Sequence, residues 1–127
     1  MRDLYSNITA VPAIAPAVQS ASVDGTAVDL KDTSRVAFVL NTGAIVSSGD
    51  FSVKVQESDT TTGGDFTDVA TAQVMTSAPA TLEANTAYRF GYTGFKRYVR
   101  LVLTKAGGTS IAAGAVAILD PLDKPVS

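Results

Sequence analysis

The chain has 127 residues, of which 46% are hydrophobic and 17% are charged, so it suits one domain with a buried core rather than a disordered tail. Because His and Cys are absent, imidazole acid–base chemistry, thiolate metal sites and disulfides are excluded. The net charge of −2 disfavours a general nucleic-acid-binding role. We expect a protein that is not an enzyme, holds no cofactor and does not bind nucleic acid.

The first 17 residues are predicted to form an extended N-terminal arm. Pro12 and Pro16 favour extended backbone and are incompatible with a helix. The apolar residues around them show no alternation of their own, so the segment would become ordered by lying along another surface. We therefore divide the chain into an arm, residues 1–17, and a β-sandwich domain, residues 18–127.

The next segments carry strand and turn signals. Residues 18–30 are predicted to form a hairpin, because Asp24-Gly25 can supply the positive φ angles of a tight two-residue turn. Residues 35–40 are apolar on both faces, which predicts a strand in the centre of a sheet. A turn is expected at residues 41–43.

A second turn, at residues 47–50, is expected before a strand with clear alternation. In residues 51–57 the side chains of Phe51, Val53 and Val55 are predicted to face the core. Residues 58–65 contain no apolar side chain and form a loop, and a return strand begins at residue 66.

Three strands are predicted in the last third of the chain. Residues 87–92 alternate weakly and carry three aromatic rings, residues 97–104 give the strongest strand pattern, and residues 110–119 form the last strand after a turn at Gly107-Gly108. Short strands separated by turn signals every roughly eight to twelve residues, in a chain rich in small and β-branched residues, predict an all-β, jelly-roll-like single β-sandwich. An immunoglobulin-like strand order would leave the same alternation, so the order stays open.

No part of the sequence favours a membrane. A membrane-spanning helix needs roughly 20 apolar residues, whereas the longest run of low polarity, residues 111–119, suits a buried strand. The N-terminus lacks the apolar run of a signal peptide. We therefore expect a soluble chain that is made in the cytoplasm of its host.

Carboxylates are concentrated in the polar loop of residues 58–68. Asp59, Asp65 and Asp68 could hold Ca²⁺ together with backbone carbonyls, but their spacing does not follow the calcium-loop pattern. Solvated carboxylates are the favoured interpretation. No metal site and no catalytic residue is assigned, and cation binding by this loop stays open.

Basic and aromatic residues are concentrated between residues 88 and 105, where no acid occurs. The aromatic rings could belong to the core beneath a solvated basic face, or Arg and Tyr could form a protein–protein contact, as both are favoured at interfaces. In such a contact Arg89, Arg97 and Arg100 are expected to meet acidic surfaces of the partner. Single-stranded nucleic acid is a weaker alternative. The predicted interface takes apolar residues from the arm and basic or aromatic residues from this stretch: Val11, Pro12, Ile14, Pro16, Arg89, Lys96, Arg97, Tyr98 and Arg100.

Residues 87–104 combine an aromatic strand, a short turn, Lys-Arg-Tyr-Val-Arg at residues 96–100 and an alternating apolar strand. This run resembles small structural proteins of tailed bacteriophages, and so do the Pro/Ala-rich opening, the region around the loop of residues 58–65 and the closing residues 115–121. The resemblance implies a capsid decoration, or cement, protein. Such a protein is a β-sandwich that binds the major capsid protein on the outside of the head, often as a trimer, so the expected location is the virion.

Two alternatives remain. A head–tail connector, a tail-tube component or the base of a head spike would have the same size and strand content, and copy number per particle would separate these from a decoration protein. A carbohydrate-binding β-sandwich would need exposed aromatic rings on which a sugar could stack. The chain has no Trp, and its Tyr and Phe residues fall mostly in predicted strands.

Overall fold

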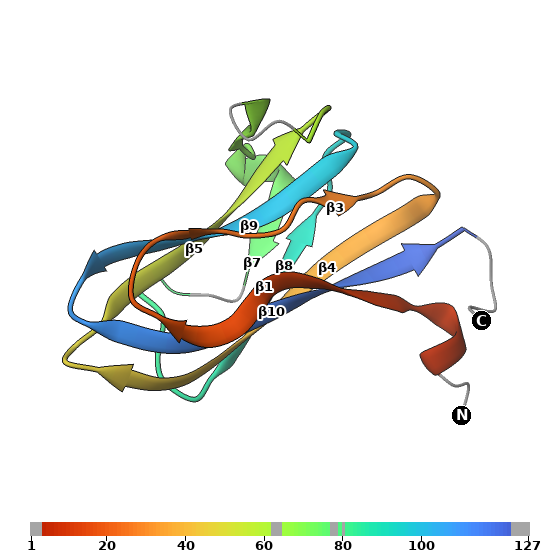
Figure 1. Cartoon of the computed structure of the whole chain (residues 1–127). Coiled ribbons are helices and arrows are strands. Elements are labelled where there is room, and N and C mark those ends of the chain that lie inside the picture. Colours follow the sequence, from red (N-terminus) through yellow and green to blue (C-terminus); the bar gives the residue numbers. More distant parts are fainter. Residues whose placement is uncertain (1–3, 62–64, 77–78, 80, 123–127) are drawn as a thin grey trace.

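Two antiparallel sheets pack face to face in the computed structural model, which describes residues 4–61, 65–76, 79 and 81–122 (Figure 1). Sheet A has the order β1 (Thr9–Gln19), β10 (Ser110–Pro121), β4 (Thr33–Val46), β8 (Ala87–Tyr92) and β7 (Val74–Thr76). Sheet B has the order β2 (Val23–Asp24), β9 (Tyr98–Gly107), β5 (Asp50–Ser58) and β6 (Thr67–Asp68), and β3 (Val28–Asp29) also pairs with β9. Two 3-10 turns, η1 (Tyr5–Asn7) and η3 (Thr71–Gln73), complete the described elements. The all-β prediction is confirmed.

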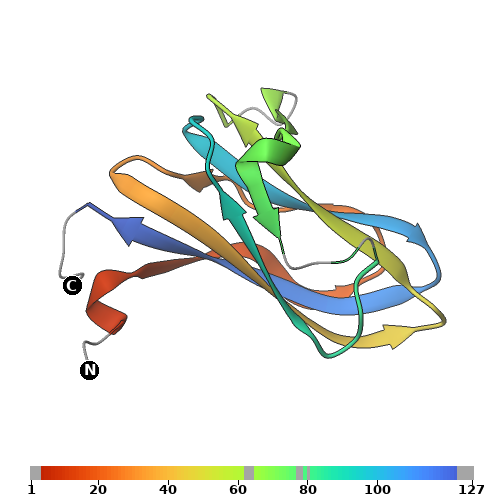
Figure 2. The ribbon, with the colours of Figure 1, turned by 180° about the vertical axis from the view of Figure 1, so that it is seen from behind.

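The strand order is that of a jelly roll. The first strand, β1, lies beside the last strand, β10, whereas β2 and β3 belong to the opposite sheet. The chain then enters sheet A with β4, crosses to sheet B with β5 and β6, and returns to sheet A with β7 and β8 (Figure 2). In an immunoglobulin-like sandwich the first strand pairs with the second, so the structure decides between the two orders that the sequence left open.

The core lies between the sheets and follows the alternation of the strands. Phe51 and Val55 of β5 are buried and Val53 packs against the core, as predicted. In sheet A, large side chains of β4 stand beside small ones of β10: Phe38 pairs with Ala117 and Leu40 pairs with Ala115. The predicted central position of residues 35–40 is confirmed, because β4 pairs with β10 on one side and with β8 on the other.

Residues 9–17, which the sequence suggested as part of a free arm, belong to the sandwich. They form most of β1, the edge strand of sheet A, and Ile14 is only 1% exposed in the core. Pro12 and Pro16 are tolerated because an edge strand can leave N–H positions unpaired. The register shifts between Pro12 and Ile14 and again between Ile14 and Ala17, so this strand bulges. The boundary at residue 17 therefore does not coincide with a structural boundary.

The predicted hairpin of residues 18–30 is wrong. Both β2 and β3 pair with β9 and not with each other. Between them, the Gly25 amide donates to the Leu101 carbonyl of sheet B at 2.7 Å, and the Thr26 amide donates to the Ala13 carbonyl of sheet A at 2.8 Å. This segment links the two sheets instead of turning tightly.

The predicted turn at residues 41–43 is also wrong, because β4 continues through it and pairs with β10. The chain turns later, where Ser47 and Ser48 have φ angles of 50° and 58°. Gly108, with a φ of 73°, forms the predicted turn between β9 and β10. Residues 62–64 of the predicted loop lie outside the described residues.

Candidate interaction surfaces

The four predicted interface residues of the N-terminal segment do not share one environment. Ile14 is buried in the core and Val11 packs against the core, so both side chains stabilise the sandwich. Pro12 and Pro16 are exposed. Pro12 lies opposite Val116 on the outer face of sheet A.

Arg97 of the predicted basic group forms a bidentate ion pair within the chain. Its Nε and Nη2 donate to Oδ1 and Oδ2 of Asp29, each at 2.9 Å. The pairing of β3 with β9 sets Asp29 directly opposite Tyr98 and so beside Arg97. The hydrogen bond from Arg97, assisted by the backbone amide of Lys31, lowers the pKa of Asp29 from 3.8 to about 2.

Asp29 should contribute to the acid sensitivity of the fold. Its pKa is lower in the folded state than in the unfolded state, so its stabilising effect is full above about pH 4 and is lost as the pH falls toward 2. Between these values the free energy of unfolding of the wild type should fall more steeply than that of Asp29→Asn. Urea unfolding at a series of pH values measures both slopes, and equal slopes would contradict the assignment.

Arg100 and Lys96 also have partners within the chain. Arg100 donates from Nε and Nη2 to the Gln56 Oε1 at 3.0 and 2.8 Å, and its guanidinium lies 4.2 Å from the centroid of the Phe66 ring. Lys96 Nζ contacts the Asp59 Oδ2 at 2.9 Å. The predicted contact of Arg97 and Arg100 with an acidic partner would therefore have to compete with intramolecular partners.

Each carboxylate of the loop spanning residues 58–68 also has its own partner within the chain. Asp59 pairs with Lys96, Asp65 accepts from the Thr60 hydroxyl at 2.7 Å, and Asp68 lies 3.2 Å from Lys54 Nζ. Across the part of the chain that the structure describes, no group of three or more potential metal-ligating carboxylates is found.

The outer face of sheet A has few charges. Residues that pair directly opposite one another lie on the same face of a sheet, so the register defines rows across it. One row runs Ala10–Ile118–Ala37–Gly91–Met75 through all five strands, and the next runs Pro12–Val116–Val39–Arg89. We call the following set the apolar face: Ala10, Pro12, Ala37, Val39, Met75, Gly91, Ala112, Gly114, Val116 and Ile118.

The apolar face is also uneven. Val116, 43% exposed, and Val39 form a ridge. A hollow of about 610 Å³ lies on one side of the ridge, beside Ala112 and Gly114. A second, of about 420 Å³, lies on the other side, beside Ile118 and Met75. The charged residues Arg35 and Asp120 pair with each other at 2.7 Å at the end of these strands.

The outer face of sheet B has the opposite character. Lys54, Gln56 and Arg100 lie on it, and hydrogen bonds and ion pairs join them to Asp68 and Asp24. A solvated face with internally balanced charges is the ordinary surface of a soluble β-sandwich. The contrast sets the apolar face apart as a candidate interaction surface.

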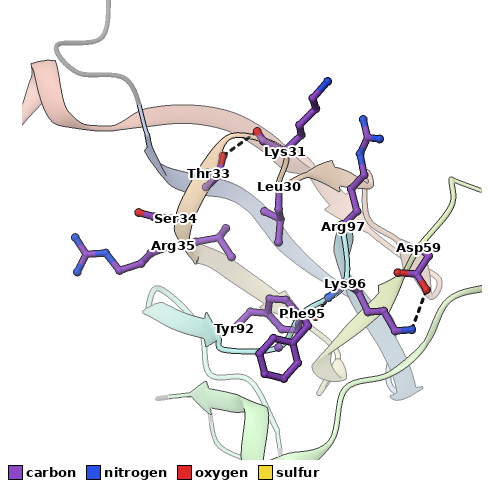
Figure 3. A pocket seen from close by; sticks show the side chains of 12 residues that line it. Leu30, Lys31, Thr33, Ser34, Arg35, Asp59, Tyr92, Phe95, Lys96 and Arg97 are labelled. Carbon is purple, nitrogen blue, oxygen red and sulfur yellow. Dashed lines mark hydrogen bonds and ion pairs between the residues drawn. The ribbon is translucent and has the colours of Figure 1, made fainter.

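A second candidate lies at one end of the sandwich, where the β8–β9 loop meets the segment between β3 and β4 (Figure 3). A pocket of about 390 Å³ is lined there by Leu30, Val36 and Tyr92. Beside it the Phe95 ring is 91% exposed. Among the charged residues that line this pocket, cations outnumber acids: Lys31, Arg35, Lys96 and Arg97 against Asp59.

The Tyr92 hydroxyl holds the loop that carries Phe95. It donates to Glu57 Oε1 at 2.6 Å. It also accepts from the Lys96 amide at 3.0 Å (Figure 3). Burial, together with the hydrogen bond to Glu57, raises the pKa of Tyr92 to about 12, so the hydroxyl stays protonated at neutral pH. A Cβ at Gly94 would collide with the Tyr92 ring, which shows how closely the loop backbone follows it.

The sequence predicted this region only in part. It singled out Lys96 and Arg97, whereas Phe95 was considered only as one of the aromatic residues among the basic ones. Phe95 lies between two predicted strands, where alternation says nothing about exposure. Most members of the apolar face were missed as well. The signal that could have found them is the apolar character of both faces of residues 35–40, which was attributed wholly to burial.

No helix among the described residues is long and apolar enough to cross a membrane. No protein-family model and no curated protein match the chain. The solved structure of the SPBc2 prophage-derived protein YomS is similar to this chain, with a TM-score of 0.51 and 10% sequence identity. The match covers 88% of this chain and 91% of that one. At this identity the similarity shows a shared fold.

Proposed function

We propose that this protein is a virion structural protein of a tailed bacteriophage, and specifically a capsid decoration protein that binds the major capsid protein on the outer surface of the head and stabilises the shell. Its work is adhesion and not catalysis. The resemblance of residues 87–104 to phage structural proteins supports the proposal, and so does the fold shared with a prophage-derived protein.

The observation that carries the proposal is the unequal division of the surface. Sheet B presents charges that are balanced within the chain, whereas sheet A presents the apolar face. An exposed apolar surface of this kind is typical of a protein that is covered in its assembly. A decoration protein needs surfaces that become covered, since it contacts both other copies of itself and the shell.

We assign the apolar face to contact with a second copy of this chain. The face lacks the like charges that would make identical subunits repel each other, apart from Arg89 at its margin. One row of the face crosses all five strands, which lie about 4.8 Å apart, so the face is roughly 19 Å wide at that row. The resemblance implies three copies.

Introducing a charge into the ridge should break this oligomer. Val116→Lys places an ammonium in the centre of the proposed contact, where burial without a counter-ion is costly, and the oligomer should dissociate to monomers at micromolar concentration. Thr104→Lys is the matched control, because Thr104 is an exposed outward residue of sheet B. Light scattering coupled to size exclusion gives the masses. A monomeric wild type, or an unchanged Val116→Lys oligomer, would refute the assignment.

Protein composition of purified particles tests the function itself. Virions of the phage that carries the gene should contain this protein in numbers comparable with the shell subunits, and a cryo-EM map should show it outside the head. Density confined to the portal, the tail or one spike would instead favour the connector, tail-tube or spike alternatives. Absence from the virion would reject all of these.

A further inference from the structure

We infer that Phe95 is the anchor by which this protein docks on the shell, inserting into an apolar socket bordered by carboxylates on a coat subunit. The inference rests on the proposed function and names the residue and the partner chemistry of that contact. It concerns the loop end of the sandwich and not the apolar face of sheet A.

No residue in the described part of the chain covers the Phe95 ring. At 91% it is the most exposed of the large hydrophobic side chains that the structure describes. Burying such a ring would contribute about 1.5–3 kcal/mol through the hydrophobic effect, yet the fold leaves it in solvent. A partner that covered the ring would recover this free energy. Aromatic side chains in well-packed pockets are typical hot spots of protein interfaces.

The loop around Phe95 is held in place before any partner binds. The Tyr92 hydroxyl accepts a hydrogen bond from the backbone amide of Lys96, the residue that follows Phe95. Lys96 and Arg97 are themselves joined to Asp59 of the β5–β6 loop and Asp29 of β3. An ordered loop loses little conformational entropy on binding, so more of the contact energy becomes affinity.

The charges around the Phe95 ring indicate which charges the partner carries around its socket. The adjoining pocket is lined by Lys31, Arg35, Lys96 and Arg97 and also by Asp59, the partner of Lys96. Asp29 and Asp120, the ion-pair partners of Arg97 and Arg35, do not line it, so the cations remain in excess. Exposed ion pairs of this kind are weak, so carboxylates of a partner can share these cations. A coat surface with an apolar depression and an acidic border fits this end of the molecule.

Binding of labelled protein to heads of the phage that carries the gene, stripped of the native protein, tests the inference. Phe95→Ser should raise Kd by about thirtyfold or more, and its melting temperature should match the wild type because the ring is exposed. Val46→Ser is the matched control: Val46 is a 47% exposed apolar residue at the other end of β4, beside the β4–β5 turn, and its Kd should not change. Raising the salt concentration should weaken wild-type binding.

The outcomes separate the two proposals. If the wild type binds saturably and Phe95→Ser binds within twofold of it, the anchor is refuted while the decoration function stands. If wild-type binding is insensitive to salt, the carboxylate border is wrong. If the wild type does not bind to stripped heads, both the function and the anchor are overturned.

Discussion

Deletion of residues 1–17 is expected to prevent folding altogether. The deletion removes most of β1, which pairs with β10 along eight residue positions. It also removes Ala13 and Ile14 from the core, and loss of a buried Ile side chain down to Cβ alone costs about 2–5 kcal/mol. Domains of this size have a free energy of unfolding of about 5–15 kcal/mol. The loss of these core side chains together with the pairing between β1 and β10 should exceed that stability.

Circular dichroism and one-dimensional proton NMR of the truncated chain would show this directly. The spectrum should lack dispersed amide signals and the cooperative melting of the full chain. Deletion of residues 1–8 is the control, since it leaves β1 intact, and this variant should fold. A folded, cooperatively melting chain that lacks residues 1–17 would mean that the segment is a detachable arm after all.

The contrast between β1 and the other strands shows what single-sequence patterns can predict. Strands such as β5 and β9 bury one face, so their alternation is visible, and the inward residues Phe51, Val53 and Val55 of β5 were predicted correctly. In β1 two bulges interrupt the alternation and two prolines suggest a segment without partners. An edge strand accepts both features because only one of its sides is paired. Whether such a segment lacks partners or forms an edge strand depends on β10, which lies more than ninety residues away in sequence.

The charge pairs were unpredictable for the same reason. The sequence shows a basic stretch without acids, and that stretch suggested an acidic partner molecule. The partners of Arg97 and Lys96 are Asp29 and Asp59, which only the pairing of β3 and β5 with β9 brings near. Local composition therefore identified residues of a charged end of the molecule, but it could not show that Lys96 and Arg97 already have partners within the chain.

The sequence predicts part of the candidate surfaces, but only when the fold is also known. The apolar character of both faces of β4 correctly predicted its central place in sheet A. A strand that is apolar on both faces normally belongs to a sheet that is covered on both sides. Here sheet B covers one face, and no described element covers Val39 and Val116 on the other. The pattern that predicted burial thus indicates a surface that becomes buried only on assembly.

Gly25→Ala is the substitution with the second largest expected effect. The sequence suggested that Gly25 supplies a positive φ, but Gly108 is the glycine with a positive φ among the described residues. Gly25 is needed for close approach: a Cβ there would collide with the Leu101 carbonyl and lie 2.6 Å from the Ala13 carbonyl. Those two oxygens accept the amides of Gly25 and Thr26, so relief of the collision must disturb the link between the sheets.

The free energy of unfolding should fall by about 2–4 kcal/mol for Gly25→Ala, from overpacking against backbone and from weakened hydrogen bonds. Gly107→Ala is the matched control. A Cβ at Gly107 meets nothing within 4 Å and its φ is not positive, so the change should be neutral or stabilising by up to about 1 kcal/mol through the unfolded state. Urea unfolding of the three proteins measures both values. Effects of the same sign and size at the two glycines would show that backbone freedom, and not contact between the sheets, is what Gly25 provides.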